Sequence, residues 1–135
     1  MATAPQFTTT ANKGTPQTLT SANTATDGTG TVALIFTAGS SGSLVPIVRA
    51  MHLGSNVATV LRIFRNNGSD PTVAGNNALI AEKTIAANTL SQTAESIPYD
   101  IHTNLVLANG ERLYATIGTA VAAGLRVGPV NAGDF

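Results

Sequence analysis

Cysteine and tryptophan are both absent from this chain of 135 residues. Without thiols no disulfide can form, and a structural zinc site loses its usual ligands. Aromatic residues make up 4% of the chain and charged residues 10%, and the seven basic and seven acidic side chains cancel. No excess of one charge attracts phosphates or acidic lipids, and few rings are available to stack on bases. The composition therefore predicts no nucleic-acid and no membrane-surface binding.

Long apolar runs are also missing. Each run spans only a few residues, whereas a membrane-crossing helix needs roughly 20. The first residues carry no basic cluster followed by an apolar stretch, so we expect no signal peptide. The lack of cysteine is typical of a protein that folds in a reducing compartment, and together these features predict a soluble protein.

The residues that usually carry catalysis are few and scattered. The seven carboxylates are spread along the chain with no calcium-loop spacing, and the histidines are limited to His52 and His102, too few for a three-histidine zinc site. Residues 28–33 match a dinucleotide-binding pattern, but they precede a predicted strand rather than a helix. We therefore expect no enzyme activity, no cofactor and no metal.

The residues that are abundant favour strands. Threonine, serine, asparagine, glycine and alanine dominate, and short apolar runs alternate with Gly and Asn turns. The predicted strands cover residues 31–37, 44–53, 57–65, 79–85, 105–107, 113–117 and 124–130. About seven or eight short strands with frequent turn signals predict an all-β fold, a single antiparallel β-sandwich of jelly-roll type.

Three local patterns give sharper expectations. The apolar runs on either side of Asn109–Gly110 predict a hairpin, because Asn and Gly readily form its tight turn. In residues 44–53, alternation places Met51 and Leu53 on the buried face and His52 on the surface. His102 is expected in a loop over residues 98–104.

Residues 1–30 differ from the remainder. They contain ten threonines and two charges, and Phe7 and Leu19 are their sizeable apolar residues after Met1. Such a segment buries too little apolar surface to fold alone. We predict an extended N-terminal arm over 1–30, either a disordered tail or a strand ordered by a neighbour, and a sandwich domain over 31–135. The domain is expected to fold without the arm but to attach poorly to its partner.

Partner contacts are expected from both segments. The arm offers Phe7 and Leu19, and the sandwich offers Arg49, His52 and Arg62. Arginine is favoured at interfaces, although a solvated sheet face is the alternative for both arginines. Few surface charges and a modest core also favour a homo-oligomer, most simply a trimer with cyclic symmetry.

Four stretches resemble a known family: residues 60–68, 76–84 and 105–115, together with Gly133-Asp134-Phe135. They are similar to the capsid decoration, or cement, class of small virion proteins of tailed bacteriophages. The resemblance implies a β-sandwich protein, often trimeric, that sits on the assembled capsid and stabilises it without catalysis.

On this reading the partner is the major capsid protein, and Phe135 joins the candidate contact residues. The location is the capsid surface of the virion, assembled in the host cytoplasm. The alternatives are a phage tail or fibre component and a carbohydrate-binding adhesive module.

Overall fold

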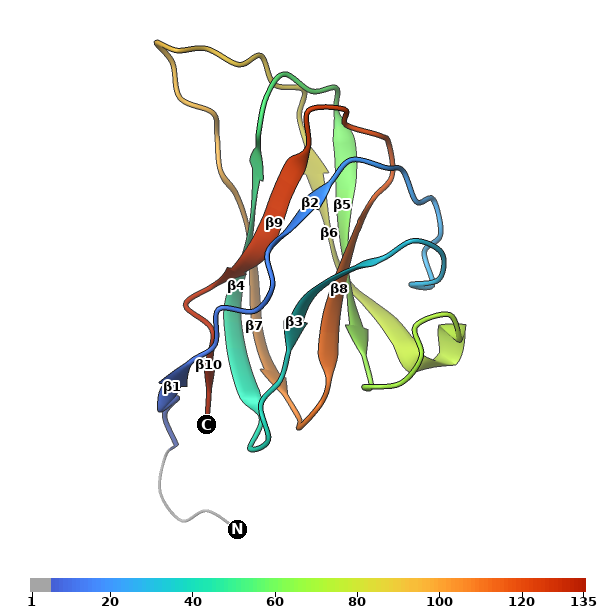
Figure 1. Ribbon diagram of the computed structural model, residues 1–135, viewed down its shortest axis with the longest axis vertical. Coiled ribbons are helices and arrows are strands. Elements are labelled where there is room, and N and C mark those ends of the chain that lie inside the picture. Colours follow the sequence, from blue (N-terminus) through green and yellow to red (C-terminus); the bar gives the residue numbers. More distant parts are fainter. Residues whose placement is uncertain (1–5) are drawn as a thin grey trace.

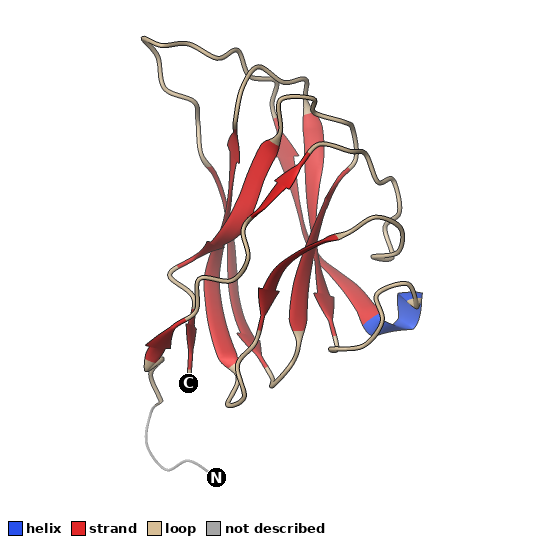
Figure 2. Cartoon of the chain, in the orientation of Figure 1, coloured by secondary structure: helices blue, strands red, loops and turns tan. Residues whose placement is uncertain are grey.

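The computed structural model describes residues 6–135, so the first five residues of the predicted arm lie outside it. One short 3₁₀ helix, η1 (Ala74–Asn76), accompanies the strands (Figure 1; Figure 2). The strands are β1 (Thr10–Ala11), β2 (Gln17–Leu19), β3 (Ala33–Thr37), β4 (Ser43–His52), β5 (Thr59–Asn66), β6 (Asn77–Ile85), β7 (Tyr99–Leu107), β8 (Arg112–Ile117), β9 (Leu125–Val130) and β10 (Gly133–Asp134).

The strands form two antiparallel sheets that face each other. In the first sheet β7 pairs with β4, β4 with β9, and β9 with β2. The short strand β10 pairs with the start of β4, and β1 pairs with β10. The second sheet has the order β3-β8-β5-β6. The prediction of an all-β sandwich is therefore confirmed, and residues 79–85 form a strand as expected.

The pairing follows a simple rule from the ends of the chain inward. Strand β2 pairs with β9, β3 with β8, β4 with β7 and β5 with β6. Two further pairs, β4 with β9 and β5 with β8, join these into the two sheets. The chain thus resembles one long antiparallel hairpin that has been wrapped into a sandwich.

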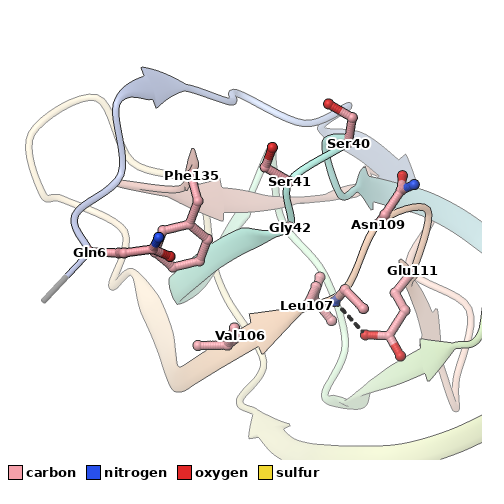
Figure 3. Close-up of a pocket in the computed structure, with 10 residues that line it drawn as sticks. Gln6, Ser40, Ser41, Gly42, Val106, Leu107, Asn109, Glu111 and Phe135 are labelled. Atoms are coloured by element: carbon pink, nitrogen blue, oxygen red, sulfur yellow. Dashed lines mark hydrogen bonds between the residues drawn. The ribbon is translucent and has the colours of Figure 1, made fainter. Parts of the chain in front are cut away.

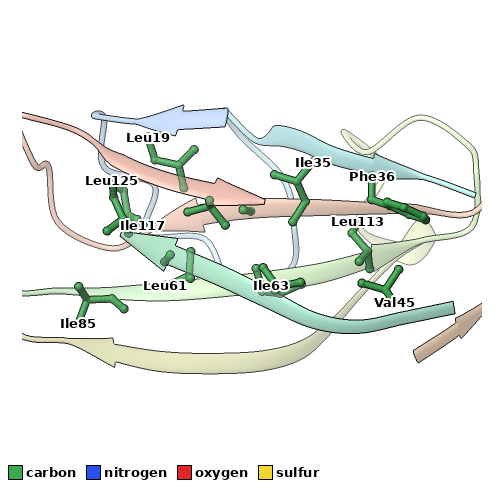
Figure 4. Packing of buried hydrophobic residues seen from close by; sticks show 14 of the residues in the cluster. Leu19, Ile35, Phe36, Val45, Leu61, Ile63, Ile85, Leu113, Ile117 and Leu125 are labelled. Atoms are coloured by element: carbon green, nitrogen blue, oxygen red, sulfur yellow. The ribbon is translucent and has the colours of Figure 1, made fainter. Parts of the chain in front are cut away.

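The core lies between the sheets, and side chains from both sheets fill it (Figure 4). In β8 the inward positions Leu113, Ala115 and Ile117 are at most 1% exposed. From the facing sheet, Val48 and Val127 are fully buried. Burying a side chain of this size contributes about 1.5–3 kcal/mol, so the alternating apolar residues account for the stability of the sandwich.

The prediction that residues 1–30 form an arm separate from the sandwich is wrong. Strand β1 pairs with β10, β2 pairs with β9, and Leu19 is 8% exposed within the core. Backbone hydrogen bonds to an edge strand require no apolar side chains, so a Thr-rich segment can join a sheet through its main chain alone. The N-terminal segment is extended, as expected, but the strands that order it belong to its own domain.

The connection from β2 to β3 covers the outer face of the second sheet. Asn23 N–H donates to the Ile117 carbonyl on β8 (2.7 Å), and Asn77 on β6 donates its side-chain amide to the Asp27 carbonyl (3.2 Å). Since β5 lies between β8 and β6, the connection crosses β5. There Phe64, opposite Tyr114, is fully buried outside the main core. The N-terminal segment therefore contributes Leu19 to the core and also crosses the outer face of the second sheet.

The prediction that His52 faces the surface is wrong, because β4 changes its buried face at Pro46. Val45 is buried before this proline, whereas after it Val48, Ala50 and His52 are buried and Met51 is exposed. The pairing of β4 with β7 shifts register between Val45 and Ile47. Proline has no N–H for the ladder and favours such irregularities, so a strict two-residue alternation gives the wrong face here.

The predicted hairpin around Asn109–Gly110 is also wrong, although the turn itself is present. Glu111 N–H donates to the Ala108 carbonyl (3.1 Å), and Gly110 has φ +75°. However, β7 pairs with β4 and β8 pairs with β3 and β5. The turn links the two sheets, so Leu107 and Leu113 enter the core from opposite sides. His102, expected in a loop, lies on β7 and is exposed.

Candidate partner-binding surface

The two ends of the described chain meet at one end of the sandwich, at the bottom of Figure 1. The carboxylate of Asp134 on β10 accepts hydrogen bonds from the Asn12 side-chain amide (2.9 Å) and from the Ser43 hydroxyl. These two donors, the Ser43 hydroxyl first, hold the pKa of Asp134 below its ordinary value of 3.8. An ionised Asp134 thus links the N-terminal segment to β4.

Phe135 lines two open hollows at this end, and Figure 3 shows the larger one. The larger, about 730 Å³, is lined by Gln6, Ser40, Ser41, Gly42, Val106, Leu107, Ala108, Asn109, Glu111 and Phe135. The smaller, about 480 Å³, is lined by Gln6, Phe7, Thr9, Ser41 and Phe135. We call the surface formed by these two sets of residues the terminal surface.

The terminal surface exposes two large apolar side chains and has few charged side chains. Phe7 is 80% exposed and Val106 is 61% exposed. Glu111 is the charged side chain among the described residues that line it, and its carboxylate already accepts a hydrogen bond from Ala108 N–H (2.9 Å). Exposed apolar groups around a hollow are typical of a contact site for another molecule.

Of the predicted contact residues, the structure brings Phe7 and Phe135 together. They lie near opposite ends of the sequence, and the pairing of β1 with β10 places them on the same hollow. Leu19 is unavailable to a partner because it belongs to the core. Val106 was not among the predicted residues; its position directly before buried Leu107 on a strand is the signal that could have identified it.

His52 is 7% exposed and takes part in an internal hydrogen-bond network. Its Nε2 lies 3.0 Å from the Ala86 carbonyl, and its Nδ1 lies 3.1 Å from the Asn56 side-chain nitrogen. Asn56 also donates to the Gly124 carbonyl (3.0 Å) and accepts from Ala123 N–H (3.0 Å). These bonds connect three loops, so His52 has a structural position rather than a place in a contact surface.

Arg49 and Arg62 lie away from the terminal surface, one on each sheet. Arg49 forms a two-pronged ion pair with Asp100 on the neighbouring strand (2.7 and 3.0 Å), which lowers the pKa of the Asp100 carboxyl. Arg62 donates its Nε–H to Glu82 (2.7 Å). Both arrangements fit the alternative of a sheet face with cross-strand pairs. A role of either arginine in partner contact stays a prediction.

A second group of exposed apolar side chains lies at the opposite end of the sandwich: Leu53, Val57, Leu90 and Ile97, each more than half exposed. The last two belong to the strandless segment 86–98, at the top of Figure 1. Asn88 pairs with Asn56 through two backbone hydrogen bonds of 2.9 Å and holds this segment in place. Loops of such length are uncommon unless they are functional. The length of segment 86–98 is the sequence signal that could have identified this second group of exposed residues.

Within residues 6–135, no group of three or more His, Asp or Glu side chains is placed to hold a metal ion. No helix in the same range is long and apolar enough to cross a membrane. Comparison with known proteins gives no match: neither a family model nor a curated protein nor a solved structure is similar to this chain.

Proposed function

We propose that this protein is a non-enzymatic virion component, a capsid decoration protein that attaches to the major capsid protein and stabilises the phage head. The observation that carries the proposal is the terminal surface, which exposes Phe7 and Val106 beside Phe135 and has Glu111 as its charged side chain. The resemblance of residues 60–68, 76–84 and 105–115 to the cement class supplies the identity of the partner.

The attachment is mainly apolar and hydrogen-bonded. A standard protein interface buries about 800 Å² on each partner, and exposed Phe7 and Val106, with half-buried Phe135, supply its apolar centre. Because the chain is neutral, association receives little electrostatic steering, and salt has little to screen. Each copy that bridges neighbouring capsid subunits adds buried area across a joint, and a cyclic trimer multiplies the number of joints held.

The strand pairing supports the same proposal. Eight strands paired from the ends inward are consistent with a jelly roll. Jelly rolls occur in viral capsid domains and in lectin domains. A fold by itself does not determine function, so the pairing supports the capsid proposal without separating it from sugar binding.

The experiment compares particles that carry the wild-type protein with particles that lack it, heated at low and high salt, with genome release as the readout. We expect release at a higher temperature with the protein at both salt concentrations. Equal release temperatures would reject a stabilising role, and loss of the protein at about 1 M salt, where the Debye length is about 3 Å, would reject apolar attachment.

A matched pair of variants locates the surface. Val106→Ser changes an exposed valine in the larger hollow, whereas Val73→Ser changes one that is 53% exposed in the β5–β6 connection. The first should lower the number of copies per particle and the second should not. Equal occupancy of both variants would place the attachment surface elsewhere.

A carbohydrate-binding adhesive module is the second candidate. The larger hollow is lined by the Phe135 ring and by the amide side chains of Gln6 and Asn109, with Asn109 across the hollow from the ring (Figure 3), and a ring with a few polar groups is typical of small-ligand sites. Binding to immobilised glycans that Phe135→Ala abolishes would favour this candidate. Absence of glycan binding, with retention on particles, would favour the capsid role.

A further inference from the structure

The chain contains two Asn-Gly dipeptides, Asn67–Gly68 and Asn109–Gly110. Asparagine is thermolabile, and most so before glycine, because no side chain hinders the backbone nitrogen of that glycine. We propose that Asn109 is a site of spontaneous deamidation in the folded protein, whereas Asn67, in the same dipeptide, is protected by its hydrogen bonds.

The reaction needs water and no other reactant. The backbone nitrogen of Gly110 attacks the side-chain carbonyl carbon of Asn109, loses its proton, and closes a five-membered succinimide as the side-chain nitrogen leaves as ammonia. Water then opens either carbonyl of the ring. The product at position 109 is an aspartyl or an isoaspartyl residue, so one amide is exchanged for one carboxylate and nothing is oxidised or reduced.

At Asn67 all three reacting groups are held. Its side-chain nitrogen, the leaving group, donates to Asn76 Oδ1 (3.1 Å). Its side-chain oxygen accepts from Ser69 N–H (3.0 Å). The attacking nitrogen, that of Gly68, donates to Asn66 Oδ1 (2.8 Å). Ring closure here must break bonds that fix the amide and the nucleophile, and each such bond contributes about 1 kcal/mol.

At Asn109 none of these groups is held by the described part of the chain. The Asn109 side chain is exposed and has no hydrogen bond within residues 6–135, and Gly110 N–H has no acceptor there. The turn bond from Glu111 to Ala108 leaves the reacting atoms free. Around Gly110, no heavy atom outside residues 109–111 lies within 4 Å of the position that a Cβ would occupy. The attack therefore meets no competing hydrogen bond from the described residues.

The product changes the terminal surface. Asn109 lines the larger hollow, in which Glu111 is the charged side chain, so deamidation adds a further carboxylate beside the exposed apolar groups. A desolvated unpaired charge opposes binding. This consequence rests on the proposed function: ageing of Asn109 before assembly is expected to lower attachment to the capsid.

The test uses the full chain incubated in mildly alkaline buffer, folded or unfolded in urea, followed by digestion and mass-spectrometric quantification of both sites. In the folded protein we expect conversion at Asn109 at least about tenfold faster than at Asn67, the ratio that one or two ordinary hydrogen bonds produce. In urea the two rates should be similar. Equal rates in the folded protein, faster conversion at Asn67, or none at Asn109 would overturn the proposal.

Two variants sharpen the result. Asn76→Ala removes the acceptor of the Asn67 amide and should raise the rate at Asn67, whereas an unchanged rate would reject the protection argument. Asn109→Asp, which introduces the product charge directly, should lower particle occupancy. If Asn109 deamidates but Asn109→Asp occupies particles like the wild type, the deamidation site stands and the terminal surface is not the attachment surface.

Discussion

Replacing Leu19 by alanine should destabilise the whole domain, although Leu19 lies in a Thr-rich segment that reads as a tail. Its side chain is 8% exposed, and β2 carries it into the core beside Leu125. Leu→Ala in a core costs about 2–5 kcal/mol, through lost transfer energy and the cavity left behind. Because β2 has an open edge that can relax, we expect about 2–3 kcal/mol. At this chain length that corresponds to a fall in Tm of roughly 8–12 °C.

Urea unfolding at equilibrium measures this loss, with Phe7→Ala as the control. Phe7 is 80% exposed and precedes β1, so its truncation should change stability by less than about 0.5 kcal/mol. A Leu19→Ala protein as stable as Phe7→Ala would refute the integration of the N-terminal segment. Deleting residues 6–28 should then also be tolerated, whereas the structure predicts that the deletion exposes the core and prevents stable folding.

Three further predictions concern single side chains. Since the folded pKa of Asp134 is lowered, its stabilising effect should be present above pH 3.8 and vanish as pH falls through the folded value; urea titrations of the wild type and Asp134→Asn should therefore differ at neutral pH and converge in acid. His52→Ala should cost about 2–4 kcal/mol from two lost hydrogen bonds and a cavity, whereas exposed His102→Ala should leave the urea midpoint unchanged. Arg49→Ala should leave Tm nearly unchanged at high salt, because an exposed ion pair contributes little; a large drop there would contradict this reading.

Strand positions could be predicted from the sequence because each run carries its own local signal. The apolar residues of 113–117 alternate, and Gly and Asn mark most strand ends. The partners of the strands could not be predicted. A turn such as Asn109–Gly110 fixes a change of chain direction, but it does not determine which sheet the next strand joins. The buried face of β4 could not be predicted either, because Pro46 shifts the alternation without altering the apolar content of the run.

The terminal surface was only half visible in the sequence. Phe7 and Phe135 stand out as apolar residues near the chain ends, but their proximity depends on the pairing of β1 with β10. That pairing is made by backbone groups, which any sequence possesses. Leu19 and His52 were wrongly predicted to contact a partner. Each has polar or exposed neighbours in the sequence, and tertiary contacts alone bury it.

Mass-spectrometric quantification of purified phage particles can show whether this protein attaches to the capsid through the terminal surface. We expect the wild type at a fixed, high stoichiometry to the major capsid protein, with Val106→Ser reducing this number and Val73→Ser preserving it. Absence of the protein from particles, its restriction to tails, or equal occupancy of the two variants would show that it does not attach to the capsid through this surface.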